Sequence, residues 1–376
     1  MKDKKAEIIA RHTIGSFGLN NSYLSISGTI NSWSYIAYGN YKFGNDWRPN
    51  SSFKSVQGHI SLSKKITRKT SLEIEFTKMY YLAQQPGGLT DNLFNSNPDT
   101  SLRERNWFRV NWNMAALNIQ HAFSSNASLT SKTFGLIASR ESLGYLDQIN
   151  RIDPIYTDPT KAGRNLISGV FQNIGNETRY IQKYRAFNQP WAFVSGIRVY
   201  KGYSENRQGA ANREYGPDFY FVGLDGNATN ANVNTDYQFP SFNVALFGEH
   251  IFNLSKKLSV TPGIRYEYIS TNANGSYRYS NFDLAGNIVF DTLFNSDRTS
   301  NRDFVIAGLG ITYKATKDIE LYSNFSQNYR SIHFTEMQIQ NPNFKIDPDL
   351  QDETGFNSDL GIRGQISNKL FFLERA

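Results

Sequence analysis

The chain has 376 residues, a formal net charge of +7 and no cysteine, which excludes disulfides and thiolate metal sites. No stretch approaches the roughly 18 consecutive apolar residues that a membrane-spanning helix needs. Aromatic residues make up 14% of the chain, yet the mean hydropathy is only −0.51 and long amphipathic helical patterns are missing. The composition therefore indicates a β protein, and the scattered basic residues argue against nucleic-acid binding.

Apolar and polar residues alternate along the chain in segments that predict β-strands. Taken in chain order, the predicted strands are 6–13, 21–28, 33–43, 55–63, 70–81, 114–123, 128–141, 179–185, 191–203, 241–253, 258–269, 302–313, 319–329 and 355–366. A further strand begins at Leu370.

The segment that begins at Leu258 shows the alternation most clearly. Leu258, Val260 and Ile264 share one face of this strand, while Arg265 and Glu267 share the other. Charged side chains cannot face lipid without a large cost, so we expect Arg265 and Glu267 to face a barrel lumen.

Two kinds of connection alternate between the predicted strands. The short, Lys-rich turns are 63–70, 254–257 and 314–318, and the long polar loops lie near 82–113, 142–178, 204–240, 271–301 and 330–354. Short turns at one end of a sheet and long loops at the other are typical of outer-membrane barrels. Low mean hydropathy fits such a barrel, because only every second strand residue faces lipid.

Several stretches resemble the barrel region of TonB-dependent outer-membrane receptors, most closely those of the ferric-citrate type. Residues 6–18 resemble the first barrel strand and its turn, and residues 83–91 followed by 105–108 resemble a characteristic external loop. Residues 262–267 resemble the mid-barrel strand written P-G-x-R-Y, and residues 322–330, 347–350 and 359–364 resemble a late pair of strands. The resemblance covers essentially the whole chain.

This resemblance implies an all-β fold, an antiparallel transmembrane β-barrel, of which the chain supplies about 14–15 strands of an expected 22. It implies that residues 1–376 are a partial barrel domain without the plug, the TonB box or the C-terminal strands. Open strand edges are costly in hydrocarbon, so we expect the chain alone not to be a competent transporter.

The resemblance also implies a receptor and transporter in the bacterial outer membrane for an iron chelate such as ferric citrate or another siderophore. The expected partners are outer-membrane lipid, lipopolysaccharide and, for the full-length parent, the TonB complex. No bound cofactor is expected, since the Fe(III) chelate is the ligand. A passive porin-like barrel, a sugar-oligomer importer and a soluble β-rich adhesin or glycan-binding module remain open as alternatives.

The titratable residues give no sign of catalysis. The five histidines are scattered without metal-ligand spacing, and neither a G-x-S-x-G elbow nor a phosphate-binding loop occurs. We therefore predict that the protein is not an enzyme and holds no metal site of its own.

Ligand binding is the remaining chemistry, and an anionic iron chelate calls for cationic donors in the external loops. The candidates are Arg103, Arg105, Arg109, Arg151 and Arg164, with Gln84 and Gln85 as neutral donors. Loop arginines also commonly pair with nearby carboxylates or with lipopolysaccharide phosphates, and this alternative stays open.

Overall fold

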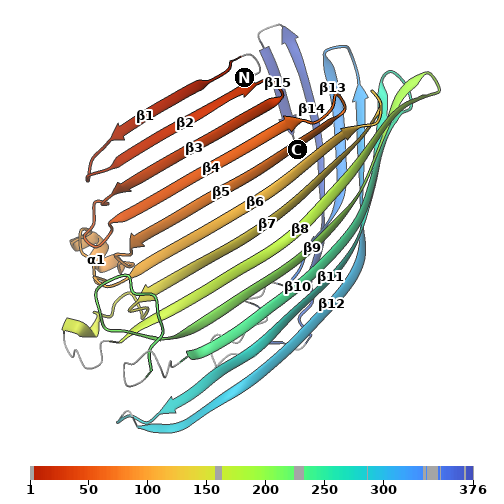
Figure 1. Cartoon of the computed structure of the whole chain (residues 1–376). Helices are drawn as coiled ribbons and strands as arrows, with labels where there is room; N and C mark the ends of the chain where they lie inside the picture. The colour runs from red at the N-terminus through yellow and green to blue at the C-terminus, as the bar shows by residue number, and fades with distance from the viewer. Residues whose placement is uncertain are drawn as a thin grey trace.

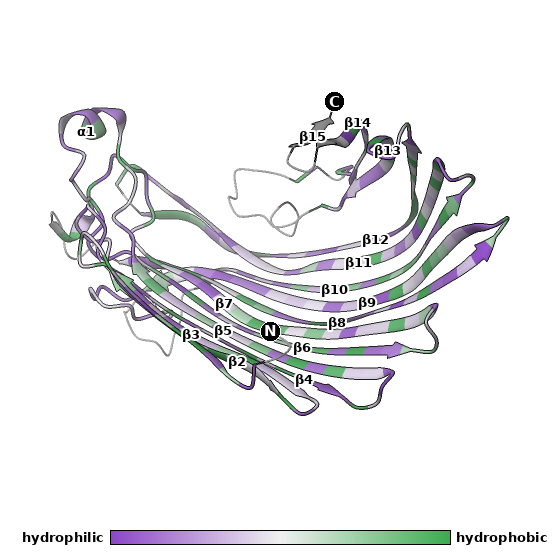
Figure 2. Cartoon of the chain, turned by 90° about the horizontal axis from the view of Figure 1, so that it is seen from above, coloured by the Kyte–Doolittle hydropathy of each residue, from purple (hydrophilic) through white to green (hydrophobic). Residues whose placement is uncertain are grey.

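A computed structural model describes residues 4–156, 163–223, 233–285, 287–332, 336, 346–347, 349–367 and 370–375. These residues form one antiparallel sheet of 15 strands, in which each strand pairs with the next in sequence (Figure 1). The sheet curves strongly, and β1 and β15 are its edges within the described residues, so the barrel wall is open (Figure 2). The predicted fold class is therefore confirmed.

The strands appear in the predicted order, including the one that begins at Leu370. They are β1 (Glu7–Ile14), β2 (Asn20–Ile30), β3 (Trp33–Gly44), β4 (Phe53–Lys65), β5 (Thr70–Gln84), β6 (Trp107–Ala122), β7 (Ala127–Gly144), β8 (Arg164–Ala186), β9 (Gln189–Ala211), β10 (Val233–Asn253), β11 (Leu258–Phe282), β12 (Ile288–Lys314), β13 (Ile319–Arg330), β14 (Glu353–Ser367) and β15 (Leu370–Arg375).

Two short helical segments connect strands, α1 (Asp91–Ser96) and a 3₁₀ turn (Pro154–Tyr156). Neither is long and apolar enough to cross a membrane. Both lie in the loops at the end of the sheet where the long connections gather, here called the long-loop end. The other end of the strands, where β4 turns into β5, is called the short-turn end (Figure 1).

The strands on either side of the long loops extend further than the alternation predicts. The prediction of a loop near 271–301 is wrong. In this region β11 and β12, of 25 and 27 residues, form one hairpin that stays paired along its length, with a single register shift next to Phe282. The predicted loops near 142–178 and 204–240 likewise contain the first part of β8 and the last part of β9. Outside a bilayer both strand faces meet water, so alternation disappears while backbone pairing continues.

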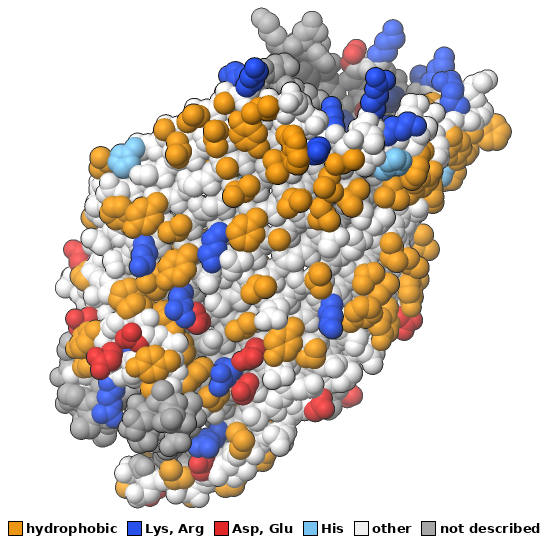
Figure 3. Space-filling model, viewed as in Figure 1, with side chains coloured by type: hydrophobic (Ala, Val, Ile, Leu, Met, Phe, Trp, Pro, Cys, Tyr) orange, Lys and Arg blue, Asp and Glu red, His pale blue; other side chains and the backbone are white. Residues whose placement is uncertain are grey.

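Apolar side chains cover the convex face of the sheet, and polar side chains lie on the concave face. Ile60, Ile74 and Ile264 are 58%, 53% and 60% exposed, and Figure 3 shows such side chains as a broad band. Contiguous apolar exposure of this extent is typical of a lipid-facing barrel wall. Arg265 and Glu267 lie on the other face and form an ion pair there, as predicted.

Four short turns are closed by the same local device. In each turn one hydroxyl oxygen accepts hydrogen bonds from the backbone N–H groups two and three residues ahead, at 3.0 to 3.1 Å. The hydroxyls belong to Thr67, Ser124, Ser255 and Thr316. Such a hydroxyl turn needs no partner from elsewhere in the chain, so each short turn is self-contained.

Candidate functional site

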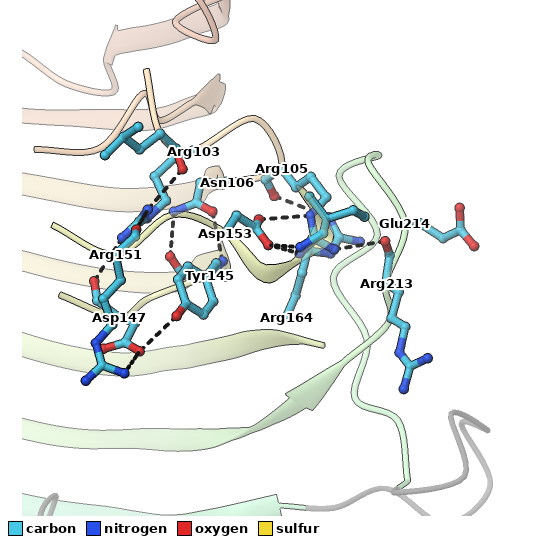
Figure 4. Close-up of polar contacts among 12 residues, drawn as sticks. Arg103, Arg105, Asn106, Tyr145, Asp147, Arg151, Asp153, Arg164, Arg213 and Glu214 are labelled. Atoms are coloured by element: carbon cyan, nitrogen blue, oxygen red, sulfur yellow. Dashed lines mark hydrogen bonds and ion pairs between the residues drawn. The ribbon is translucent and has the colours of Figure 1, made fainter. Parts of the chain in front are cut away.

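Three long loops meet at the long-loop end of β5 to β10 and hold one another (Figure 4). They are residues 85–106 between β5 and β6, the part of 145–163 that the structure describes, and residues 212–223 after β9. Arginine side chains from the first loop and from the start of β8 make most of the contacts. We call this arrangement the loop platform and define it by Arg103, Arg105, Asp153, Arg164 and Asn212.

Arg105 and Asp153 form the centre of the loop platform. Both side chains are fully buried, and the Arg105 Nε and Nη2 groups donate to the two Asp153 oxygens at 3.0 and 2.6 Å. The Arg105 Nη1 group donates to the carbonyl oxygen of Arg213 at 2.9 Å. This bidentate pair joins all three loops, and losing one partner would leave the other charge buried.

Arg164 opens β8 and fastens the loop that follows β9. Its guanidinium is buried and donates to the carbonyl oxygens of Asn212 and Gly216 at 3.1 and 2.7 Å and to the Asn212 side chain. Burial and the neighbouring Arg105 charge lower the pKa of Arg164 to about 10, so it stays cationic at neutral pH. The Asp218 carboxylate, 3.8 Å away, offsets part of this effect.

Arg103 binds backbone rather than a carboxylate. Its two terminal nitrogens donate to the carbonyl oxygens of Leu102, Asp147, Gln148 and Arg151 at 2.7 to 3.2 Å. The guanidinium also lies 4.9 Å from the ring centre of Tyr145. These bonds fix the course of the loop after β7, because one guanidinium joins three of its carbonyl groups.

Asn106 and Gly144 close the platform where β7 ends. The Asn106 side chain accepts from the Tyr145 N–H at 2.8 Å and donates to the Tyr145 carbonyl at 3.2 Å. Gly144 has a φ of +151°, and a Cβ there would lie 2.1 Å from the Asn106 Oδ1 and 2.8 Å from its Cα. Only glycine lets the chain pass this close to Asn106.

A family model described as "TonB dependent receptor-like, beta-barrel" matches residues 32–374. The chain belongs to this family. TonB-dependent receptor barrels are bacterial outer-membrane proteins that transport ligands, which agrees with the convex apolar wall. No curated protein matches the chain.

Solved structures with this fold include transporters and receptors. The ferric citrate transporter FecA in its unliganded form is 16% identical with a TM-score of 0.72, and the superposition covers 96% of this chain and 48% of FecA. The ferric-catecholate import receptor Fiu of E. coli K12 is 13% identical with a TM-score of 0.74, at 98% and 57% coverage. The copper transporter OprC is 12% identical with a TM-score of 0.72, at 100% and 53% coverage. The chain therefore spans about half the length of these structures, and at such identities the likeness shows the fold.

The receptor barrel brings Arg103, Arg105 and Arg164 together, but their guanidinium groups bind protein atoms inside the loop platform. Arg109 lies apart on β6, where it pairs with both oxygens of Glu141 at 2.5 and 2.6 Å beneath the ring of Phe219. Arg151 keeps 61% of its side chain exposed and is 3.7 Å from Asp147. Of the five arginines, Arg151 has the most accessible head group.

Gln84 is the last residue of β5, and Gln85 is the first residue of the β5–β6 loop. The Gln84 Oε1 accepts a hydrogen bond from the Ser52 hydroxyl at 2.7 Å, and the Gln85 N–H donates to the Asn106 carbonyl at 2.9 Å. Both side chains are half-buried. Ligand contact by these residues and by the five arginines stays a prediction.

The sequence did not reveal the residues that accept hydrogen bonds in these loops, or a further arginine that connects two of them. Arg48 donates to the carbonyls of Gly87 and Thr100 at 2.8 and 2.7 Å and so ties the β3–β4 connection to the β5–β6 loop. Asp153, Asn106 and Asn212 were also missed. Asp153 precedes a proline and reads as an ordinary turn residue, so its sequence carries no sign of the pairing.

The concave wall of the receptor barrel carries a second set of polar contacts. Asn118 donates to Glu73 and Glu75 at 3.3 Å, and Asn243 donates to Glu267 at 2.7 Å. Within the described residues no group of three or more His, Asp or Glu side chains could hold a metal ion. The polar side chains of the concave wall therefore present hydrogen-bonding groups and charge to the lumen.

Proposed function

We propose that the barrel belongs to an outer-membrane receptor that binds an Fe(III) chelate, such as ferric citrate or another siderophore, and is energised through TonB. Family membership over residues 32–374 supports a transport receptor. The observation that carries the choice of ligand class is the arginine-rich loop platform at the long-loop end, where the Arg151 side chain is exposed. Anionic, oxygen-rich chelates are complementary to such a surface.

The proposal assigns different roles to the predicted ligand-binding residues. Arg151, with Gln84 and Gln85 near the same loops, would contact the chelate directly, because its head group reaches solvent. Arg103, Arg105 and Arg164 hold the loops, and a chelate contact from any of them requires the platform to open. Arg109 reaches a chelate only after leaving Glu141.

The proposed partners follow from the family and from the surface. The TonB complex would act on the complete receptor, while lipid and lipopolysaccharide would surround the convex wall. The ferric citrate transporter FecA shares the fold, and so do Fiu and OprC. The chemistry of the chelate is therefore the variable that an experiment has to resolve.

Titration of the detergent-solubilised chain with ferric citrate, a ferric catecholate and a copper(II) chelate, read by tryptophan fluorescence, tests the proposal. Trp107 is a suitable reporter because its indole N–H donates to the Tyr215 carbonyl at 2.7 Å within the platform. We expect saturable quenching by one ferric chelate, weakened about tenfold in Arg151→Gln through loss of a charged contact. Lys257→Gln, at the short-turn end, is the charge-matched control.

Two results would reject this function. Quenching by a neutral oligosaccharide in place of every chelate would favour the sugar-importing alternative. Equal losses in Arg151→Gln and Lys257→Gln would mean that general charge, and not the platform, attracts the chelate.

A further inference from the structure

Five side chains from neighbouring strands form a continuous row just inside the long-loop end of the sheet. They are Lys42 of β3, Phe53 of β4, Tyr81 of β5, Phe108 of β6 and Arg140 of β7, and we call this set the aromatic row. The ring centres of Phe53 and Phe108 each lie 6.4 Å from that of Tyr81. The Lys42 ammonium lies 5.4 Å from the ring centre of Phe53, and the Arg140 guanidinium lies 5.3 Å from that of Phe108. Three aromatic rings are thus flanked by a cation at each end.

The strand register places the aromatic row on the concave face. The odd-numbered residues of β5, which include the two glutamates of the concave wall, face the lumen, and Tyr81 is one of them. Successive register partners lead from Tyr81 to Lys42 through Ser55 and from Tyr81 to Arg140 through Val110. Residues that pair across strands share a face, and each phenylalanine stands two residues from a member of this line. All five side chains therefore lie on the lumen side of the wall.

The two cations of the aromatic row keep their charge available. Within the part of the chain that the structure describes, neither Lys42 nor Arg140 has a carboxylate at ion-pair distance. The opposite face of the same region differs, because Arg109 of β6 is neutralised there by Glu141 of β7. Cations that face a lumen without a carboxylate partner attract an anion.

The aromatic row lies next to the loop platform in the strands that carry it. Phe108 is two residues from Asn106, and Tyr81 is three residues from Gln84. The three rings are half-buried, so part of each ring surface is accessible, and the Arg140 side chain is exposed. A ligand that has passed the platform toward the lumen therefore meets aromatic rings and unneutralised cations on the wall beside it.

We propose that the aromatic row binds an anionic Fe(III) chelate whose donor groups are aromatic, such as a catecholate. This inference rests on the proposed function and narrows its ligand class. The aryl rings of the chelate would pack against Tyr81 and Phe108, since aromatic rings favour offset or edge contacts with one another. Its ionised oxygens would accept hydrogen bonds from Arg140 at one end of the row. A citrate chelate carries the charge but no ring, so it would gain the ionic contact alone.

Equilibrium dialysis of the full chain in detergent micelles against the Fe(III) complex of catechol or against ferric citrate, with bound iron measured, tests this assignment. We expect the catechol complex to bind more tightly. The ring variant, Tyr81→Leu with Phe108→Leu, should weaken its binding about tenfold and leave ferric citrate binding unchanged. The matched control is Phe76→Leu with Tyr80→Leu, which removes one ring of each kind from the opposite face of β5.

The charge at the end of the aromatic row is tested separately. Arg140→Gln should weaken the binding of both chelates about tenfold, because both are anionic and lose the same charged donor. Lys132→Gln removes a positive charge from the same face of β7, eight residues nearer the short-turn end, and should change neither affinity.

Other outcomes overturn the assignment and separate it from the proposed function. Tighter binding of ferric citrate than of the catechol complex by the unsubstituted chain would reject the aromatic ligand class and leave the receptor function standing. Equal losses for both chelates in the ring variant, with circular dichroism showing an intact sheet, would mean that the rings do not recognise aryl groups. An unchanged affinity in that variant would place the catechol complex elsewhere on the protein. Binding of neither chelate by the unsubstituted chain would overturn the proposed function itself.

Discussion

The two ends of the barrel are held by opposite means. At the short-turn end a hydroxyl closes each of four turns onto residues two and three positions away. At the long-loop end Arg105 joins Asp153, 48 residues away, to the Arg213 carbonyl, 108 residues away. Damage to one short turn should therefore stay local, whereas damage to the platform should spread through three loops.

Asp153→Ala should have the largest effect, because it leaves the buried Arg105 charge without its partner. Removal of one member of a buried ion pair costs about 3–5 kcal/mol. We expect amides in all three loops, including those near Tyr145 and Arg213, to lose protection in hydrogen-exchange mass spectrometry.

Asp147→Asn is the control for this experiment, since Asp147 pairs with Arg151 at the exposed edge of the same loop. Hydrogen bonds from the Gln148 N–H and the Tyr145 hydroxyl hold the pKa of Asp147 below its usual value. An exposed pair contributes about 0–1 kcal/mol, so the platform should survive this change. Equal loop opening in both variants would contradict the central role of the Arg105–Asp153 pair.

Gly144→Ala should open the platform less completely. The added Cβ would meet the Asn106 backbone, and the positive φ adds strain of about 1–3 kcal/mol. The expected result is faster proteolysis after Tyr145 with β7 intact. The control is Gly39→Ala, at a strand position with no atom within 4 Å of the new Cβ, and it should leave the rate of proteolysis unchanged.

Ser124→Ala should have the smallest effect, confined to one short turn. It removes the acceptor for the Asn126 and Ala127 N–H groups, which is worth about 1 kcal/mol or roughly a fivefold loss of local protection. The neighbouring Ser125→Ala keeps that acceptor and is the matched control. Exchange that rises in the distant loops as well would refute the local character of this end.

The same contrast explains what the sequence could predict. Strand alternation and short turns depend on residues that are neighbours in the chain. The positions of β5, β11 and the Lys-rich turns can therefore be predicted from the sequence. The partners of Arg103, Arg105 and Arg164 lie in other loops, and no local pattern marks Asp153 or Asn212 as their acceptors. The length of β11 and β12 was also hidden, because consecutive apolar residues such as those at 288–290 and 293–294 interrupt the alternation that marks a strand.

The hairpin of β11 and β12 is longer than a membrane crossing requires. At about 3.3 Å per residue, its 25 and 27 residues extend roughly 80 Å, whereas a bilayer crossing uses about ten residues of a tilted strand. The rest of the hairpin extends further as a paired two-stranded ribbon, and Leu284, Val289 and Phe290 are exposed near its tip. A molecule that approaches the sheet from the long-loop end therefore meets this hairpin before it meets the apolar wall.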